Sequence, residues 1–279
     1  MFIFFLIFIQ IIAEVLPISS SGHIFLLKKA WNFAGYTIDP HQIFPTIDFL
    51  LHIPTLFVLL LFFFKRWWNI ILHKPIHYLV FFEKESWKKI GSVLIFLGVS
   101  SFITFLFWWK RYYEYVTTPV WIGFLATGLV LFAMKFLPKV KTSKINQGRK
   151  GLWQIQNAVI LGLVQGAMMN AGFSRFGFTL FFSRLLGYNF NTAFEISFLL
   201  EMPLLFGASM KALLDIYKKP EIFSEYFAIH GLFAMLVAAI LSYFVLKGVN
   251  KLVEKNKLHY ISGYMIIPLI ISLLFERGS

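Results

Sequence analysis

The sequence of 279 residues contains no cysteine, only 13 acidic residues, and charged side chains at only 14% of its positions. The absence of cysteine excludes disulfides, thiol nucleophiles and thiolate metal sites. The scarcity of charge excludes an ordinary water-soluble enzyme, because a globule of this size needs more polar surface than the chain supplies. The period-two alternation of a membrane β-barrel is also absent.

Hydrophobic residues, in contrast, make up 58% of the sequence, and its mean hydropathy is +0.73. Long apolar runs recur along the chain, several near the roughly 20 residues that a helix needs to cross a bilayer. We therefore predict an all-α polytopic membrane protein with six transmembrane helices. The predicted crossings are residues 44–64, 90–109, 119–137, 192–215, 226–246 and 258–275.

Two further apolar segments, about 1–29 and 153–190, are each interrupted by a polar stretch. Residues 17–22 break the first segment, and residues 170–175 break the second. A continuous helix that faces lipid does not accommodate such stretches, so we predict two re-entrant helix hairpins. The first segment is not expected to be a removable signal peptide, because it lacks a basic start and a small-residue cleavage site.

Lysine and arginine together outnumber aspartate and glutamate by 26 to 13, giving a formal net charge of +13. This excess gathers in the connections 65–89, 135–150 and 247–257, which the positive-inside rule assigns to the cytoplasm. The charge thus indicates loops that face an anionic leaflet, and no nucleic-acid partner is expected.

With this orientation, the two hairpins enter the bilayer from opposite sides. We therefore predict one integral membrane domain, 1–279, built as an inverted-topology repeat of residues 1–138 and 151–279. In such a repeat, two interrupted helices meet near the midplane, where their exposed ends form a polar site.

A first group of polar residues surrounds the break in the first hairpin. Gln10 and Glu14 are four residues apart and share one helix face. The three hydroxyls after Pro17 can cap the next helix and leave backbone N–H groups free for an anion. His23 lies three residues after Ser20, so both can project from one side of the first turn. The group thus combines a carboxylate, a hydroxyl nucleophile and an imidazole for proton transfer.

A second group places an obligatory cation, Arg175, inside the other hairpin. Its planar guanidinium suits phosphate oxygens, and Thr179, one turn later, can add a hydroxyl on the same face. Gly172 and Gly177 let the backbone approach a ligand closely.

Both groups also have a structural alternative. The serines can be plain helix caps, and His23 can be an interfacial side chain. Arg175 can serve only to neutralise a carboxylate. The candidates for that pairing are Glu14, Glu195 and Glu201. Because the last two are six residues apart and cannot share a helix face well, at most one is expected to point into the site.

These residues resemble two motifs of the bacterial undecaprenyl-pyrophosphate phosphatase family of the BacA type. The family stretches near residues 48–55 and 195–203, D-V-V-L-H-L-G-T and E-F-S-F-L-L-A-I-P, also have similar counterparts here, so the resemblance covers nearly the whole chain in order. The pattern (E/Q)xxxE followed by PxSS(S/T)GH is matched by Gln10, Glu14, Pro17, Ser19, Ser20, Ser21, Gly22 and His23, and PGxSRSxxT by Gly172, Ser174, Arg175 and Thr179.

Four positions depart from the family pattern, which makes the chain similar to a divergent member and leaves its substrate and rate open. Ala171 replaces a proline, which is expected to loosen the hairpin. Phe176 replaces a serine and removes a hydroxyl near the phosphate site. Pro54 replaces a glycine, and Glu201 stands where a small residue is usual.

The resemblance implies hydrolysis of undecaprenyl pyrophosphate, a polyprenyl diphosphate, to undecaprenyl phosphate and inorganic phosphate. This reaction recycles the lipid carrier for cell-wall synthesis. The implied location is the bacterial plasma (inner) membrane, with the active site open to the outer, periplasmic side. The residues agree with this reading, because an apolar tail needs access from the bilayer and a diphosphate needs cationic groups at a sheltered site.

We predict four catalytic residues. Ser20 attacks the terminal phosphorus, while His23 accepts its proton or protonates the leaving oxygen. Arg175 stabilises charge on the phosphate oxygens. Glu14, together with Gln10, binds a divalent cation, Mg²⁺ or Ca²⁺, or positions the nucleophile. The predicted phosphate-binding residues are Ser19, Ser21, Gly22, Gly172, Ser174 and Thr179. Two alternatives stay open, in which His23 is itself the nucleophile or activates water.

Asp48 and His52, four residues apart on the first crossing, are expected either to support this site or to serve a structural role at the membrane interface. The expected partners are the lipid substrate and membrane lipids, and a homodimer is an open alternative.

Two other functions also stay open. One is a transporter or flippase for an anionic lipid or small anion on the same fold, and the other is a catalytically silent accessory protein in envelope assembly. The joint presence of Ser20, His23 and Arg175 favours hydrolysis, because transport alone does not require a nucleophile, a proton carrier and a phosphate clamp together.

Overall fold

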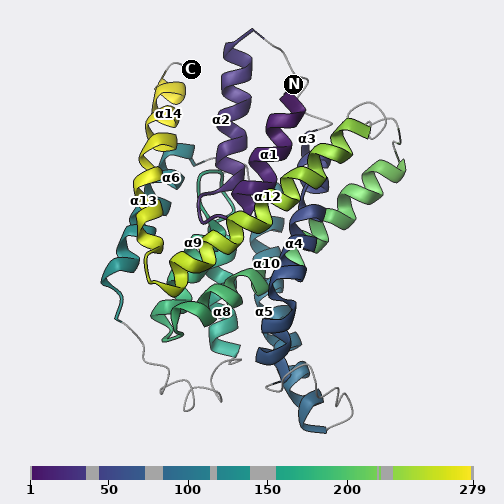
Figure 1. The fold of residues 1–279 in the computed structure, drawn as a ribbon, viewed down its shortest axis with the longest axis vertical. Helices are drawn as coiled ribbons and strands as arrows, with labels where there is room; N and C mark the ends of the chain where they lie inside the picture. The colour runs from purple at the N-terminus through teal and green to yellow at the C-terminus, as the bar shows by residue number, and fades with distance from the viewer. Residues whose placement is uncertain are drawn as a thin grey trace.

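The computed structural model describes residues 2–35, 44–72, 84–113, 118–138, 155–218, 220 and 229–277. Every regular element in these ranges is a helix, as the sequence predicts (Figure 1). The helices are α1 (Phe2–Glu14), α2 (Ser20–Phe33), α3 (Phe44–Leu50), α4 (His52–Leu72), α5 (Lys84–Tyr113), α6 (Val120–Ala133), η1 (Met134–Phe136), α8 (Ile155–Ala167), α9 (Arg175–Leu185), α10 (Phe190–Lys218), α12 (Ile229–Glu254), η3 (Leu258–Tyr260), α13 (Ile261–Tyr264) and α14 (Ile266–Arg277).

Five stretches of helix are long and apolar enough to cross a membrane. Their outer faces carry large apolar side chains, such as Phe102 and Phe233, whose exposed fractions are 62% and 68%. Lipid tails cover such faces favourably, whereas water does not. The chain is therefore a multi-pass membrane protein. The five stretches are Thr46–Trp68, Ile90–Lys110, Phe190–Lys218, His230–Glu254 and Leu258–Glu276.

The sixth predicted crossing, 119–137, is a shorter apolar helix that covers Val120–Phe136. Pro119 precedes it and Pro138 follows it, and proline favours a helix boundary at both positions. The first predicted crossing is divided at Leu51, where α3 ends and α4 begins.

The two interrupted segments each fold as helix, loop and helix, as predicted. The first loop lies between α1 and α2, and the second lies between α8 and α9. With 13 residues each, α1 and α8 are about 20 Å long, which is short of the roughly 30 Å apolar core of a bilayer. In Figure 1, α1 and α2 lie in the upper half of the molecule and α8 lies in the lower half.

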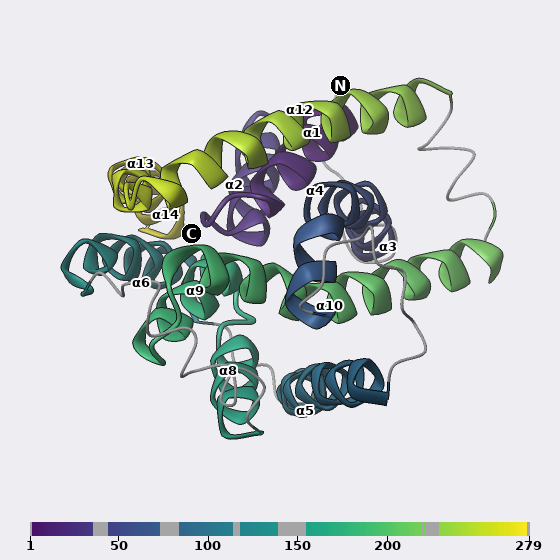
Figure 2. The same cartoon turned by 60° about the horizontal axis from the view of Figure 1, so that its bottom comes forward.

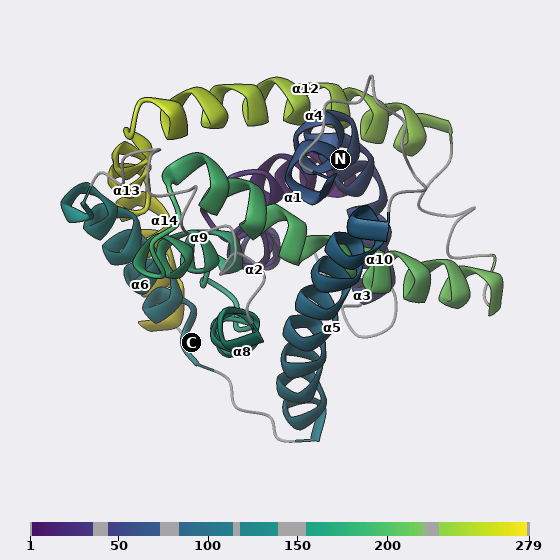
Figure 3. The same ribbon diagram turned by 90° about the horizontal axis from the view of Figure 1, so that it is seen from below.

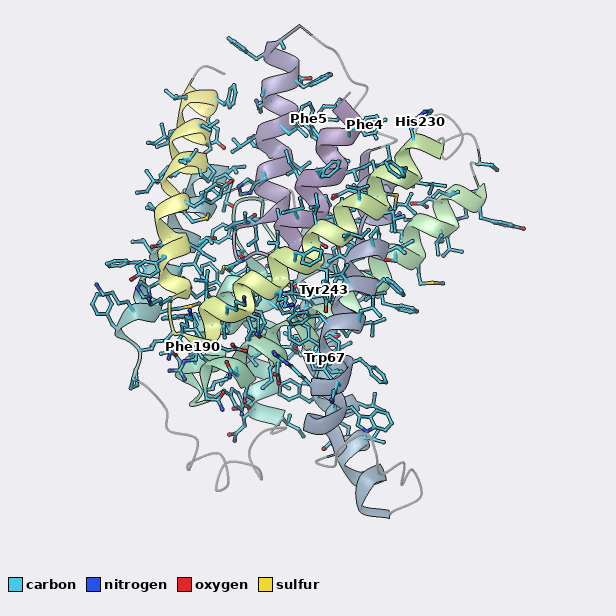
Figure 4. The ribbon with its side chains drawn as sticks, viewed as in Figure 1. Phe4, Phe5, Trp67, Phe190, His230 and Tyr243 are labelled. Carbon is cyan, nitrogen blue, oxygen red and sulfur yellow. The ribbon has the colours of Figure 1, made fainter. Side chains whose placement is uncertain are left out.

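The first helix of each hairpin packs along a long helix from the other half of the chain. Helix α1 packs on α12, and α8 packs on α5 (Figure 2). Helix α10 contacts both α3 and α4, and α14 contacts α6. Seen from below, α12 runs along one side of the molecule (Figure 3). It starts near His230, at the same end as Phe4 and Phe5, and passes Tyr243 toward the end that carries Trp67 and Phe190 (Figure 4).

A buried aromatic cluster joins α4, α9 and α10 beside the second hairpin loop. The ring of Phe176 stacks on that of Phe198 with centroids 4.2 Å apart, and Phe63 lies 5.3 Å from Phe198. Phe176, which replaces a serine of the family pattern, therefore fills the protein core, and this contact fixes α9 against α10.

The connections at 73–83 and 139–154 lie outside the described residues. The basic residues predicted there are therefore not described, and the cytoplasmic orientation stays a prediction.

Candidate active site

Glycines allow the two hairpin loops to touch. A Cβ added to Gly22 would lie 2.8 Å from the backbone nitrogen of Gly172, and one added to Gly123 would lie 2.5 Å from the carbonyl carbon of Gly172. Gly172 has a φ of +89° and has no room for a side chain beside the carbonyl oxygen of Val120. Any larger residue here would push the loops apart, so glycine is what brings the starts of α2 and α9 together.

The two loops end in the same capping arrangement. Ser19 Oγ accepts a hydrogen bond of 3.2 Å from the backbone N–H of Gly22, and Ser174 Oγ accepts one of 3.1 Å from Gly177. Each serine therefore satisfies an N–H group in the first turn of its helix. The residue after each cap is a predicted catalytic residue, and it stands at the positive end of a helix.

Glu14 links the predicted nucleophile to the predicted phosphate clamp. The hydroxyl of Ser20 donates a hydrogen bond to Oε2 of Glu14, and Nη2 of Arg175 lies 3.6 Å from Oε1 of the same carboxylate. The side chain of Glu14 is 4% exposed, whereas that of Arg175 is 25% exposed. The Glu14 carboxylate is thus placed to accept the proton of Ser20, and the more exposed guanidinium can turn to an incoming anion.

A cavity of about 500 Å³ beside these residues has a lining of two chemical kinds. Its polar side chains include Gln10, Ser20, His52 and Arg175. Its apolar side chains include Phe105 and Trp108 of α5 and Leu204 and Leu205 of α10. A lipid diphosphate combines a polar head with an apolar chain, so this cavity matches it in chemistry and lies in the usual size range of ligand pockets.

A smaller cavity of about 30 Å³ adds one more carboxylate to the site. Glu201 lines it together with Glu14, Ser20 and Arg175. Glu201 is 3% exposed, and its Oε2 has no hydrogen-bond partner among the described residues. Glu195 instead lies 3.8 Å from Arg66, so the expectation that at most one of the two glutamates points into the site is confirmed.

We expect Glu201→Ala to lower the KM for a polyprenyl diphosphate about fivefold, or roughly 1 kcal/mol, because the substitution removes carboxyl oxygens that compete with phosphate for the N–H donors of Arg175. The measurement is the KM of purified protein for the lipid diphosphate. Glu195→Ala is the matched control, since it removes a carboxylate of the same helix away from the cavity. An unchanged or raised KM in Glu201→Ala alone would contradict the expectation.

Several buried polar atoms around the cavities have no hydrogen-bond partner among the described residues. They are Oε1 of Gln10, Oδ1 of Asp48, Nδ1 of His52 and Oε2 of Glu201. His52 Nδ1 lies 3.9 Å from Oε1 of Glu14, which favours the first of the two roles considered for His52, support of the site. Oxygen donors suit Mg²⁺ and Ca²⁺, and such ions commonly use only one or two carboxylates and complete their shell with phosphate or water. The described residues contain no group of three or more His, Asp or Glu side chains that could hold a metal ion, so phosphate or water oxygens would have to complete the shell of any cation here.

His23 lies apart from this group. Its Nδ1–H donates to the carbonyl oxygen of Ser19 at 2.7 Å, and its Nε2 accepts from the hydroxyl of Tyr264 at 2.9 Å. The imidazole lines a different, apolar cavity of about 470 Å³ beside α1. The structure thus brings Ser20, Glu14 and Arg175 together, but it turns the imidazole away from them.

The other predicted phosphate ligands differ in their position. Ser21 lines both cavities that hold Ser20. Thr179 is fully buried, and its hydroxyl donates to the carbonyl oxygen of Arg175 at 2.9 Å, within its own helix. Of the remaining four residues, Ser19 and Ser174 cap their helices, and Gly22 and Gly172 lie where the two loops touch.

Two residues outside the sequence motifs form hydrogen bonds with the hairpin loops or with His23. Thr127 of α6 donates to the carbonyl oxygen of Gly172 at 3.1 Å and accepts from the N–H of Ser174 at 3.0 Å. Tyr264 holds His23, as described above. The sequence indicated Thr127 only weakly, because a hydroxyl in an apolar crossing usually binds another helix. The sequence did not indicate Tyr264, because it lies 241 residues from its partner, His23.

Comparison with known proteins agrees with the motifs. The family model described as "Bacitracin resistance protein BacA" matches residues 3–271. The chain belongs to this family. The match covers both hairpin loops and four of the five helices that could cross a membrane, and it ends within the fifth, so the resemblance predicted from the two motifs is confirmed.

Several curated relatives, all named undecaprenyl-diphosphatase, are similar to the chain over most of its length. The protein from Borrelia recurrentis is 30% identical over 276 residues, which are 96% of this chain and 95% of the relative. The protein from Halothermothrix orenii is 31% identical over 279 residues, covering 98% and 96%. The protein from Treponema denticola is 29% identical over 262 residues, covering 92% and 90%.

Proposed function

We propose that this BacA-family chain is an enzyme that hydrolyses undecaprenyl pyrophosphate to undecaprenyl phosphate and inorganic phosphate. The observation that carries the proposal is the contact of Ser20 and Arg175 with one buried carboxylate, Glu14, beside a cavity lined by both polar and apolar side chains. The names of the relatives point to the same reaction, and none names transport. The product is the lipid carrier that cell-wall synthesis uses again.

The proposed reaction begins with attack by Ser20 Oγ on the terminal phosphorus. Glu14, which already accepts the hydrogen bond of Ser20, takes its proton. Arg175 moves from Glu14 to the phosphate oxygens and stabilises their charge, together with the positive ends of α2 and α9. The bond to the lipid phosphate breaks, and water then releases phosphate from the serine. The predicted roles of His23 in proton transfer, nucleophilic attack or water activation stay predictions.

A divalent cation, Mg²⁺ or Ca²⁺, is part of the proposal, with Glu14 and Gln10 as its protein ligands. Gln10 is 2% exposed and lines the larger cavity, and its Oε1 has no hydrogen-bond partner among the described residues. When bound, the cation would offset part of the negative charge of the diphosphate.

We therefore expect a chelator to lower phosphate release from a polyprenyl diphosphate at least about tenfold, and added Mg²⁺ or Ca²⁺ to restore it. The measurement is phosphate release by purified protein in detergent, before and after removal of divalent ions. Full activity in the metal-free protein would remove the cation from the proposal and leave the hydrolysis intact. An absence of phosphate release under all metal conditions would overturn the proposed function itself.

We also propose that residues 1–138 and 151–279 form an inverted-topology repeat, with six crossings and two re-entrant hairpins. The packing supports it, because the pairing of α1 with α12 has its counterpart in the pairing of α8 with α5. The sequence register supports it too. Gln10 and Gln165 each stand nine residues before a capping serine, and His52 and Glu201 each stand two residues before a proline.

The repeat and the basic connections together favour a plasma-membrane enzyme whose site opens to the outer, periplasmic side. Membrane lipids surround it, the lipid diphosphate is its substrate, and a homodimer stays an open alternative.

A further inference from the structure

The loop that carries Ser20 contains a strained residue. Ser19 has a φ of 69° and a ψ of 91°, a conformation that residues other than glycine seldom adopt. Such a conformation persists only where neighbouring contacts hold it. Ser20 is the next residue, so the backbone conformation of Ser19 sets the direction of the Ser20 hydroxyl.

His23 is the side chain that holds the strained residue. The carbonyl oxygen of Ser19 accepts two hydrogen bonds from His23, one of 2.7 Å from Nδ1–H and one of 3.2 Å from the backbone N–H. Because a carbonyl oxygen only accepts, the first bond requires the proton on Nδ1. In the neutral imidazole this leaves Nε2 as an acceptor.

The hydroxyl of Tyr264 donates a hydrogen bond to this Nε2. Its hydroxyl lies 2.9 Å from Nε2 of His23, and the two rings are stacked with an interplanar angle of 8° and centroids 5.8 Å apart. Phe124 of α6 closes the other side of the imidazole, with its ring at 81° to it and the centroids 5.4 Å apart. The imidazole is therefore fixed on two sides by rings and at both nitrogens by hydrogen bonds.

We propose that Tyr264 is a positioning residue for the reaction of Ser20. Its hydroxyl keeps His23 in the Nδ1–H tautomer, His23 keeps the Ser19 carbonyl in place, and the hydroxyl of Ser20 is thereby directed at Glu14. Neither sequence motif contains Tyr264, which reaches the site from α13 at the far end of the chain. The inference rests on the proposed function only for its activity measurement.

The first test is a double-mutant cycle in the purified full-length protein. We expect Tyr264→Phe, which keeps the stacked ring, to lower kcat about tenfold with little change in KM, because the phosphate clamp is untouched while the nucleophile is less well aligned. In a His23→Ala background, the same substitution is expected to change kcat less than twofold, since its route to Ser20 is gone. Tyr260→Phe is the matched control, because Tyr260 is exposed one turn earlier and is expected to retain full activity.

The second test does not depend on activity. In protein labelled with ¹⁵N at histidine, the resonances of His23 are expected to report the Nδ1–H tautomer in the wild type, and a mixture of tautomers in Tyr264→Phe.

Three results would overturn the inference: wild-type kcat in Tyr264→Phe, a loss that is the same with and without His23, or an Nε2–H tautomer in the wild type. A wild-type protein without any phosphate release would instead contradict the proposed function, and the resonances of His23 would still decide whether Tyr264 sets the tautomer.

Discussion

Ser20→Ala is expected to lower the rate of phosphate release from a polyprenyl diphosphate by about 1,000-fold or more, because it removes the atom that forms the new bond to phosphorus. The structure favours Ser20 over the neighbouring serines, since its hydroxyl is the one that donates to Glu14. The measurement is single-turnover phosphate release by purified protein at saturating lipid. Binding of the diphosphate is expected to persist, because Arg175 remains.

Ser21→Ala is the matched control for this variant. Ser21 lines the same two cavities, but its hydroxyl lies 3.4 Å from that of Ser19, and the hydrogen bond to the Glu14 carboxylate comes from Ser20. We expect a loss below about tenfold, in line with one phosphate hydrogen bond. A Ser20→Ala protein that retains a rate within tenfold of the wild type would show that another group, such as water or the imidazole, attacks the phosphorus.

Arg175→Ala is expected to lower kcat/KM about 100- to 1,000-fold, because it removes the charge that the phosphate oxygens need as the bond to phosphorus forms. The same change leaves the Glu14 carboxylate in the cavity without its cation, which repels the diphosphate further. The measurement is kcat/KM for the lipid diphosphate, with the folded state checked by thermal unfolding in detergent.

Arg175→Lys separates the two contributions of this residue. Lysine keeps the positive charge but lacks the planar fork of donors, so we expect it to recover only part of the lost kcat/KM. Equal rates for lysine and arginine would show that charge alone matters. Full activity in Arg175→Ala would refute the assignment of Arg175 as the phosphate clamp.

Local features of the sequence determined a large part of this protein. The low charge and the long apolar runs required a helical membrane protein, and proline followed by hydroxyls at membrane depth required a broken helix, because neither depends on distant residues. The same local logic allowed Ser19 as a helix cap and set the two glutamates of α10 on different faces, whereas the cap by Ser174 was not predicted.

Tertiary packing alone decided how the predicted residues meet. Arg175 pairs with Glu14 because two loops about 160 residues apart in the sequence lie in contact. That contact requires glycine, since a Cβ would not fit between the loops. The sequence indicated only that Phe176 removes a hydroxyl near the phosphate site. The packing adds that its ring fills the core beside Phe198. The orientation of His23 away from Ser20 depends on Tyr264.

The physical reason for this division is the range of the forces involved. Hydrophobic periodicity, caps and proline breaks act within a few residues, so a sequence states them directly. Buried ion pairs and hydrogen bonds between helices depend on distances of a few ångströms between segments far apart in the chain, and those distances are set only when the whole bundle packs.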